Sequence, residues 1–372
     1  MFRIGDIVSP PSKFNIKSYG AIGDGTTDDT SAIVSAISAC SSAGGSEVLF
    51  PQGTYKTSSI IVIPNNVLLV GVGPGSIIKP TNAVTITAVQ LNGNYCGMKS
   101  LLVDGNNTSG ATGILVGEST ISLPSLSEVV VQNFRGSGAY GLRLKNSINA
   151  SIRNCIFLSN QTGMYAYGTS LPTVTDILGC LFQSSVEYGV RLDTAWSMNF
   201  KTCTFEGCGK NGLWLNDAYA LCVDIHVDNC WFEGNCTSSG VYHILAGAAR
   251  FTIRDAFFED GYALHVTGGS RFMFENLQIN NHVTGGVLID ASPAGFIDAM
   301  GIDYILNSVF TINSANVIIT PGPYGTVAPT TGTWRLGDTV RNSSPAAGDN
   351  MGWVCVSAGT PGTWKPFGPI GL

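Results

Sequence analysis

The chain has 372 residues, and only 12% of them are charged, about half of the roughly 25% found in an average globular protein. Its formal net charge is −6 with 19 Lys and Arg, which argues against non-specific nucleic-acid binding because that needs a basic surface. Mean hydropathy is +0.22, yet the longest apolar runs, SIIVIP and NVLLVGV, are too short to span a membrane. We therefore expect neither a nucleic-acid nor a membrane partner.

The first residues, MFRIGDIVSPPSKF, contain no apolar central region and no small-residue cleavage site. A cleaved secretory signal needs both, so we expect none, and we expect the chain to be made in the cytoplasm. Residues 1–12 are predicted to form an N-terminal arm ahead of the first folded segment.

A helix is predicted over TSAIVSAISACSSA, at residues 30–43, because its apolar residues recur at helical spacing. Asp28 or Asp29 is placed to cap its start, and Gly44–Gly45 is placed to end it. We expect this helix to cover the first strands of the fold, whose open edge would otherwise invite aggregation. The acidic residues of GDGTTDD are therefore expected to be structural.

A repeat dominates the middle of the chain. Phrases of the form NCIF begin at 154, 179, 202, 229, 255 and 276, and a second phrase, small–apolar–X–apolar, follows each by about ten residues. A third short strand precedes each one, as in SIRN and HVDN. Repeats of roughly 20–30 residues that contain strands and no helix are typical of a solenoid, and predict a parallel β-helix.

Four cysteines, Cys155, Cys180, Cys203 and Cys230, recur once per repeat. This spacing is typical of small buried apolar residues in a stacked core, so we expect reduced thiols rather than a disulfide framework. The chain has no CxxC pair and no Asp cluster typical of a calcium site. We expect no metal and no cofactor.

Residues 13–55 carry YGAIGDGTTDDTSAI, then the predicted helix, then VLFPQGTY. This segment resembles the opening of the pectate-lyase-like β-helix superfamily, in the branch that includes phage tailspikes and polygalacturonase-like enzymes. The resemblance implies an all-β fold, a right-handed parallel β-helix with an N-terminal capping helix, here spanning 13–320. It also implies a homotrimer around a shared axis, a polysaccharide substrate and an association with other virion tail proteins.

Beyond residue 320 the composition changes to a Pro/Gly/Thr linker and a short Trp-rich segment. We expect residues 321–372 to form this linker and a small C-terminal β-module. Its aromatic residues could bind sugar or could form the module's own small core, and the sequence leaves both open. They are Trp334, Trp353, Trp364 and Phe367.

One outward position of the small–apolar–X–apolar phrase carries aromatic or cationic residues in consecutive repeats, because alternate residues of a strand face opposite sides. Flat aromatic faces stack on sugar rings, and Arg donates paired hydrogen bonds to carboxylates or hydroxyls. We expect a glycan-binding surface here, with a slight preference for acidic sugars. Its predicted substrate-binding residues are Arg143, Tyr165, Arg191, Trp214, Tyr242 and His265.

Glycoside hydrolysis needs two carboxyl groups, about 5 Å apart for retention of configuration and 6.5–9.5 Å apart for inversion. Glu206 and Glu233 fit the first separation because they occupy equivalent positions on adjacent coils, while Asp193 and Asp217 fit a diagonal. We predict these four as candidate catalytic residues. Recurrence of the phrase favours a structural role for the glutamates as a set, and Asp193 and Asp217 are the better-placed pair if sugar lies along the predicted glycan-binding surface. The paired Asp motifs typical of polygalacturonases do not occur at matching positions of the repeats, which argues against transferring that mechanism directly.

The sequence thus predicts a tailspike-like depolymerase that cleaves a bacterial surface or extracellular polysaccharide, with a glycoside hydrolase favoured. The missing secretory signal fits a virion or prophage component released by lysis. A polysaccharide lyase stays open, with Tyr242 or His265 as base near Arg191. The same residues are also compatible with a non-catalytic glycan receptor and with a purely architectural β-helix.

Overall fold

Short strands joined by tight turns dominate the computed structural model, which describes residues 14–81, 87–107, 109–168, 172–216, 222–236, 242–247, 250–259, 262–267, 271–280, 287–289, 295–304, 310–312, 317–320 and 324–371. The chain divides into two units, Met1–Val190 and Arg191–Leu372, and the division falls within strand β22 (Tyr188–Leu192). Each unit is built from coils of parallel strands, so the predicted parallel β-helix is confirmed.

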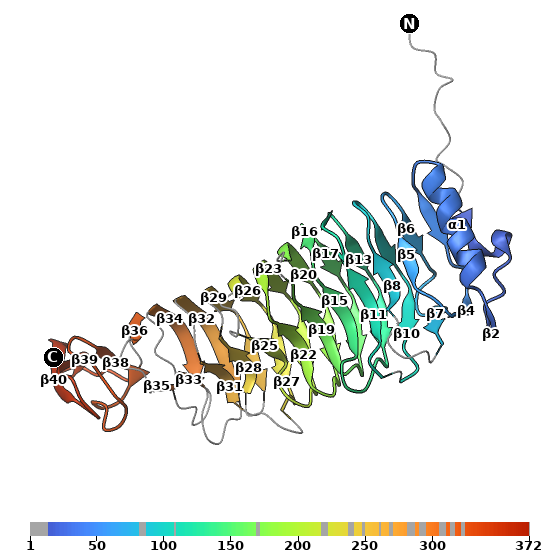
Figure 1. Cartoon of the computed structure of the whole chain (residues 1–372). Helices are drawn as coiled ribbons and strands as arrows, with labels where there is room; N and C mark the ends of the chain where they lie inside the picture. Colours follow the sequence, from blue (N-terminus) through green and yellow to red (C-terminus); the bar gives the residue numbers. More distant parts are fainter. Residues whose placement is uncertain are drawn as a thin grey trace, which may run out of the picture. The chain divides into compact units, whose positions relative to one another are not determined.

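In the first unit the coils stack their strands into three rows, with parallel pairing inside each row (Figure 1). The first row contains β1 (Phe14–Asn15), β3 (Glu47–Leu49), β6 (Leu68–Val70), β9 (Gly97–Lys99), β13 (Ser125–Ser127), β17 (Ser151–Arg153) and β20 (Thr173–Leu178). The second contains β2 (Asp24–Asp28), β4 (Gly53–Thr57), β7 (Ser76–Pro80), β10 (Leu102–Asp104), β14 (Val130–Gln132), β18 (Ile156–Leu158) and β21 (Leu181–Gln183). The third contains β5 (Ile61–Ile63), β8 (Thr87–Leu91), β11 (Thr112–Val116), β15 (Tyr140–Leu144) and β19 (Thr162–Ala166). The short strands β12 (Ile121–Ser122) and β16 (Ser147–Ile148) pair beside them.

The second unit repeats this arrangement. Its first row contains β23 (Ala195–Lys201), β26 (Cys222–Asp228), β29 (Arg250–Arg254), β32 (Arg271–Asn280), β34 (Gly295–Tyr304) and β36 (Val317–Thr320). The second contains β24 (Thr204–Glu206), β27 (Trp231–Glu233) and β30 (Phe257–Glu259), which pairs with the end of β32. The third contains β25 (Leu213–Leu215), β28 (Tyr242–Ala246), β31 (Tyr262–Val266), β33 (Val287–Ile289) and β35 (Phe310–Ile312).

Stacked aromatic rings fill the interior of the coils. In the second unit the ring of Phe232 stacks between Phe205 and Phe258, with centroid separations of 4.6 and 4.9 Å. The Phe157–Phe182 pair of the first unit stacks at 5.0 Å. These separations match the rise from one strand to the next, about 4.8 Å, so equivalent side chains on successive coils meet face to face.

All ten cysteines are free, and all except the half-buried Cys236 are buried, as the reduced-core prediction expected. Burial raises the pKa of the Cys96 thiol to about 11 and that of Cys236 to about 12. These two thiols therefore stay protonated at neutral pH and pack as small apolar groups.

The turn between the first and second rows uses a left-handed backbone conformation in coil after coil. Asn154, Asn229 and Asn276 have φ values of 52°, 51° and 51° at this turn, where Asn is the best tolerated residue after Gly. The buried asparagines lie elsewhere. Asn160 and Asn235 each donate to a carbonyl of the preceding coil and accept from its backbone N–H, so they close the turn before the third row.

Helix α1 (Thr30–Ser42) follows the short 3-10 helix η1 (Ile16–Tyr19) and packs on the first strands (Figure 1). Asp28 satisfies the amide of Thr30 at its start, whereas the buried Asp29 accepts instead from the backbone N–H groups of Ile22 and Gly23. Gly44 and Gly45 end the helix, with φ values of 97° and 94°. The predicted capping helix is confirmed. Asp28 caps its first amide, whereas Asp29 binds the loop before β2.

Acid should loosen this cap. The hydroxyls of Ser58 and Thr30, and then the Thr30 amide, lower the pKa of Asp28 to about 2 from its ordinary value of 3.8. A carboxylate with a lowered folded-state pKa stabilises the fold above its unfolded pKa, and that contribution is lost as the pH falls from about 4 to about 2. We expect the thermal unfolding midpoint to fall over this range, and less steeply in Asp28→Asn. Parallel pH profiles for the two proteins would contradict this assignment.

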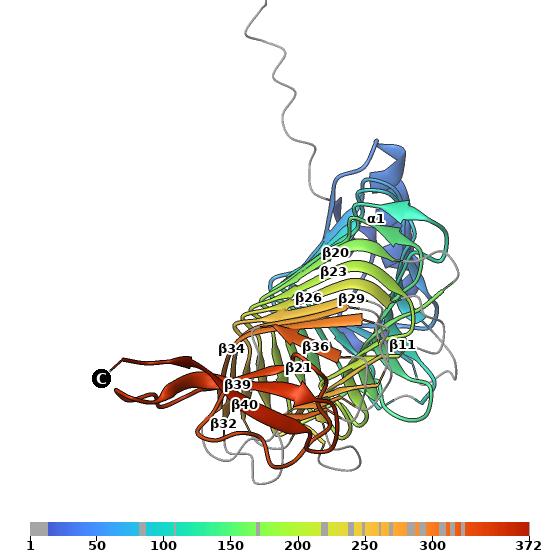
Figure 2. The ribbon, with the colours of Figure 1, turned by 90° about the vertical axis from the view of Figure 1, so that its left-hand side faces the viewer.

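A small sheet occupies the C-terminal end, with the order β37 (Tyr324–Gly325), β38 (Thr339–Asn342), β39 (Asn350–Ser357) and β40 (Thr363–Pro369). Strands β38, β39 and β40 are antiparallel, and β39 and β40 run side by side (Figure 2). Trp334 and Trp364 meet edge to face at 5.0 Å, and Trp364 pairs with the buried Cys355 across β39 and β40. These contacts favour the small-core interpretation for the two indoles. Among the described helices, none is long and apolar enough to cross a membrane.

Candidate functional site on the outer rows

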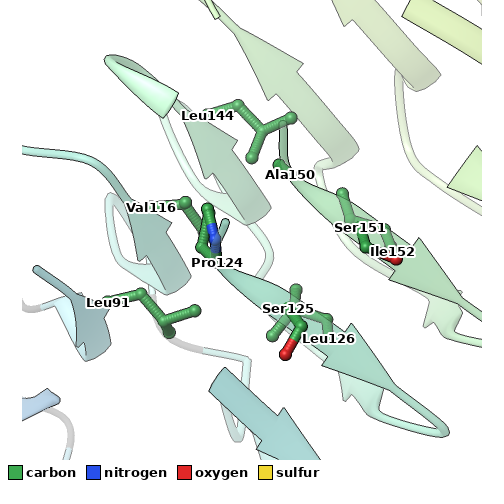
Figure 3. Close-up of a pocket in the computed structure, with 9 residues that line it drawn as sticks. All are labelled: Leu91, Val116, Pro124, Ser125, Leu126, Leu144, Ala150, Ser151 and Ile152. Carbon is green, nitrogen blue, oxygen red and sulfur yellow. The ribbon is translucent and has the colours of Figure 1, made fainter. Parts of the chain in front are cut away.

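A gap inside the first unit is too small to hold a ligand. It lies between the third-row strands β8, β11 and β15 and the segment around β13 and β17, and is shown in Figure 3. It has no room even for a water molecule. Apolar side chains dominate its lining, which consists of Leu91, Val116, Pro124, Ser125, Leu126, Leu144, Ala150, Ser151 and Ile152. This gap therefore does not serve as a ligand site.

The third row of the second unit carries an outward column in which Trp214 pairs with Leu245 and Leu245 pairs with His265. The predicted position of Tyr242 in this column is wrong, because Tyr242 begins β28 and pairs with Tyr262. Its ring nevertheless lies 4.5 Å from that of His265, so the structure brings the two residues together across the strand.

Arg191 lies on β22, which neighbours β25 in the sheet, and it forms a two-bond pair with Asp193. Nε and Nη2 of Arg191 donate to the two carboxylate oxygens of Asp193, at 2.8 and 2.9 Å. The Asn216 side chain donates to the same carboxylate at 3.0 Å, and Asp193 is only 5% exposed. The guanidinium carbon of Arg191 in turn lies 4.6 Å from the ring centroid of Trp214. Asp193 thus fixes the Arg191 guanidinium against the indole.

This arrangement changes the interpretation of the predicted Asp193–Asp217 pair. Both oxygens of Asp193 already accept hydrogen bonds, which suits a residue that positions Arg191 better than a proton donor. Asp217 lies outside the described residues. A catalytic role for this pair stays a prediction.

The third row of the first unit brings Arg143 and Tyr165 together, as predicted. Leu115 pairs with Arg143, and Arg143 pairs with Tyr165 on the next strand. Two further aromatic residues, Tyr140 and Tyr167, surround the Arg143 guanidinium, and sequence reasoning missed both. For Tyr167 the signal was its two-residue spacing from Tyr165, which puts both side chains on one face.

The second row of the second unit carries a column of carboxylates. Glu206 pairs with Glu233, and Glu233 pairs with Glu259, so all three lie in register on adjacent strands and are half-buried. Trp231, 38% exposed, donates from Nε1 to Glu233 at 2.9 Å and stacks on Phe257 at 4.0 Å. Sequence reasoning missed this bond. Its signal was again the two-residue spacing of the indole and the carboxylate.

The described side chains offer no evident metal site. Within the described ranges, no three His, Cys, Asp or Glu side chains are grouped closely enough to hold an ion. What the rows do present is aromatic surface, fixed guanidinium groups and in-register carboxylates. These can stack on sugar rings, pair with anionic or hydroxyl groups and transfer protons, respectively.

Comparison with known proteins relates the chain to a family. The family described as rhamnogalacturonase A/epimerase, pectate lyase-like, matches residues 13–214, and a right-handed β-helix region matches 188–320. The mannuronan C5-epimerase AlgE5 of Azotobacter vinelandii is 36% identical over 114 residues, which cover 26% of this chain and 11% of that protein. The match therefore spans about a tenth of the relative's length.

Two solved phage structures share the fold. ORF18 of Geobacillus virus E2 has a TM-score of 0.63 and 20% identity, covering 93% of this chain and 65% of its own. The tailspike gp49 of Acinetobacter baumannii bacteriophage Fri1, a capsular polysaccharide depolymerase, has a TM-score of 0.59 and 13% identity, covering 82% of this chain and 64% of its own. At these identities the similarity concerns the fold.

Proposed function

The chain belongs to the rhamnogalacturonase A/epimerase, pectate-lyase-like family, and we propose that it binds and cleaves a bacterial surface or extracellular polysaccharide. Glycoside hydrolysis is the reaction we favour. The observation that carries this proposal is the in-register pair Glu206 and Glu233 beside the exposed indole of Trp231.

The spacing of the pair suits retaining hydrolysis. Neighbouring strands lie about 4.8 Å apart, and retaining glycosidases hold their two carboxyl groups about 5–5.5 Å apart. In this mechanism one carboxylic acid protonates the departing glycosidic oxygen, while the other carboxylate attacks the anomeric carbon. Water then hydrolyses the glycosyl–enzyme bond, with the first residue acting as base. Because Trp231 holds Glu233 through its N–H, we assign Glu233 as the oriented carboxylate that attacks and Glu206 as the acid.

The aromatic and cationic residues supply binding surface for the chain of sugars. Trp231, exposed and held on one face by stacking on Phe257, gives an apolar surface beside the carboxylates. Arg191 held over Trp214, with His265 two strands away in the same row, gives a second binding surface in this unit. A sugar bound at Trp231 would present a glycosidic bond to the glutamates beside it.

A lyase is the second candidate, and the contact between Tyr242 and His265 favours it. A lyase removes the proton next to a uronate carboxylate, so it needs a base and a cation that neutralises the carboxylate. The Tyr242 and His265 rings are 4.5 Å apart on the row that also carries Arg191. The epimerase relative is named for reaction at C5 of mannuronan, a step that also requires removal of a proton.

The phage proteins that share this fold support a virion setting. We propose that the chain acts outside the bacterial cell as a tailspike-like component, assembled as a homotrimer and docked to other tail proteins. The outward column of Thr204, Trp231 and Phe257 is apolar enough to serve either a partner chain or a sugar. Analytical ultracentrifugation would distinguish a trimer from a monomer.

Incubation with a panel of bacterial capsular polysaccharides and exopolysaccharides tests the proposal, following reducing ends together with absorbance in the unsaturated-uronate band. New reducing ends without new absorbance are expected for the hydrolase. Both signals together would indicate the lyase and direct attention to Tyr242 and His265. Binding of a glycan that is never cleaved would overturn the enzyme assignment in favour of a receptor, and absence of both binding and cleavage would favour a purely architectural β-helix.

A further inference from the structure

His243 lies inside the second unit, where the other coils place an apolar or very small residue. It belongs to β28 and is 1% exposed, and its ring packs against those of Phe232 and Phe258, with centroid separations of 6.3 and 6.0 Å. On β25 of the preceding coil the equivalent position is Gly212, and on β31 of the following coil it is Ala263. The histidine is therefore an addition to the repeat and not a requirement of it.

The hydrogen bonds of Asn235 show which ring nitrogen of His243 carries no proton. Oδ1 of Asn235 accepts from the backbone N–H of Cys208 at 3.0 Å, and Nδ2 donates to the carbonyl of Phe205 at 2.8 Å. These two backbone partners cannot exchange roles, so they fix the orientation of the amide. The same Nδ2 lies 2.9 Å from Nδ1 of His243, which must accept this hydrogen bond and is therefore unprotonated.

These bonds connect the two coils that carry the candidate carboxylates. Phe205 and Cys208 lie on either side of Glu206 in the sequence, whereas Asn235 follows Glu233 by two residues. Asn235 thus holds the turn after Glu206 against the coil of Glu233, and His243 accepts the remaining N–H of the amide that does so.

The first unit contains the same backbone contacts without the histidine. Asn160 accepts from the N–H of Phe134 at 3.1 Å and donates to the carbonyl of Val131 at 2.9 Å. On β19, the strand that follows Asn160, the second residue is Gly163, whereas on β28 the second residue is His243. The asparagine contacts therefore belong to the repeat, and the ionisable group is added in the coil beside the glutamates.

A second proton on His243 would be unfavourable in this position. It would place an N–H at Nδ1 against the N–H of Asn235, so that two donors would meet in an interior filled by phenylalanine rings. The glutamates of the surrounding strands alternate with those inward phenylalanines and face outward. The described titratable side chains on the elements around His243 are Glu206, Cys208, Glu233, Cys236, Tyr242, Glu259 and His265.

We propose that His243 is an acid-sensitive latch of the second unit. Unprotonated, it accepts from Asn235 and keeps the turn after Glu206 in place; protonated, it loses that bond, and the two coils loosen. The latch goes beyond the proposed function, because it regulates the fold of this unit and requires no particular reaction.

The sign of the pH dependence follows from the two states. The folded unit needs a bare Nδ1, whereas a histidine in an unfolded chain takes up a proton near pH 6.5, roughly. The unfolded state therefore binds one more proton below that pH, and stability falls as the pH falls. The equilibrium constant for unfolding should rise about tenfold per pH unit from this group. The window lies above that of Asp28, so the two effects can be measured separately.

Chemical denaturation between about pH 7.5 and about pH 5, followed by tryptophan fluorescence, tests the latch. All six tryptophans lie between residues 196 and 364, so their signal reports the second unit. In His243→Asn the amide Oδ1 replaces Nδ1 as acceptor and cannot be protonated, so about tenfold per pH unit of the dependence should disappear. His226→Asn is the control, because His226 is half-buried on β26 and lies 3.5 Å from Asp224. It should keep the wild-type loss of stability in acid.

A second measurement needs no variant that folds. In the long-range proton–nitrogen NMR spectrum of protein labelled at its histidine nitrogens, bare and protonated ring nitrogens resonate in separate regions. The chain has four histidines, and one of them should keep a bare Nδ1 for as long as the tryptophan signal reports a folded unit.

Protonation of all four histidines in the folded protein would overturn the latch. So would a folded His243→Asn protein whose stability depends on pH as the wild type's does. Neither measurement involves cleavage of a polysaccharide. Failure of the latch would therefore leave the proposed function standing, and an inactive protein that shows the predicted pH dependence would do the reverse.

Discussion

Replacing Glu206 or Glu233 by glutamine is expected to reduce polysaccharide cleavage by about 10³-fold while leaving glycan binding within a factor of a few. Loss of a positioned acid such as Glu206 costs about 10²–10⁴-fold. Glutamine at position 233 removes the attacking carboxylate, so a loss at least as large is expected there. In both variants the glutamine keeps the shape of the side chain. Reducing-end kinetics on the substrate found in the panel, together with equilibrium binding of the same glycan, measure the two effects separately.

The same glutamine substitutions are not expected to lower the stability of the fold. Glu206, Glu233 and Glu259 stack like charges directly across adjacent strands, which is unfavourable in a sheet. Removing one charge is expected to leave the thermal unfolding midpoint unchanged or slightly raised, so that lost activity cannot be assigned to misfolding. A glutamine variant that loses activity because it unfolds would contradict this expectation.

Glu259→Gln is the matched control, since Glu259 belongs to the same column and lies one strand beyond the assigned pair. It should relieve the same repulsion and keep most of the activity. If Glu259→Gln is as inactive as Glu233→Gln, the reacting pair is Glu233 and Glu259. If all three variants remain active, the column is a product of the repeat and the hydrolase assignment fails.

The periodicity of the sequence was sufficient to predict the coils, because inward Phe and Cys must recur wherever strands stack. It also predicted which residues of the second row face outward, and the pairing of Glu206 with Glu233 confirms that register. The predicted register was wrong in one third-row strand. The alignment of the repeated phrases placed Tyr242 outward beside Trp214, whereas β28 begins at Tyr242 and Leu245 is the residue that pairs with Trp214.

The reason is a buried histidine. In YGLRL and YGVRL the residue after Tyr is glycine, and in YHILA it is His243, which is 1% exposed and bonded to the buried Asn235. A polar residue in an inward position breaks the apolar alternation that sets register in a sequence alignment. The hydrogen-bond partner of His243 is Asn235, which lies eight residues earlier in the turn of the same coil. No local sequence pattern predicts this hydrogen bond.

Side-chain contacts between coils were equally difficult to predict from the sequence. Opposite charges two residues apart on a strand suggest that Arg191 and Asp193 share a face. The buried Asp193 also accepts a hydrogen bond from Asn216 in the following coil, which the pattern of a single strand cannot place. The sequence therefore predicted which residues lie on the outer rows better than it predicted the role of each residue there.

Asp193→Asn should separate a catalytic acid from a positioning residue. The change keeps the shape but removes the charge that anchors Arg191, so we expect the free energy of unfolding to fall by about 1–3 kcal/mol. Asp228→Asn is the matched control, because Asp228 forms a similar two-bond pair with the exposed Arg254. Exposed pairs contribute about 0–1 kcal/mol, and this variant should be nearly as stable as the wild type. Chemical denaturation of the three proteins measures the difference.

Kinetics then decide the role of Asp193. If it acts by holding Arg191 against Trp214, Asp193→Asn raises KM with little change in kcat, because the fixed guanidinium contributes to binding in the ground state and the transition state alike. Arg191→Gln should then show the same split, and the double variant should lose no more than the single ones, since both changes disrupt one unit. If Asp193 is itself the acid, Asp193→Asn lowers kcat by orders of magnitude while Arg191→Gln does not, and the positioning role is wrong.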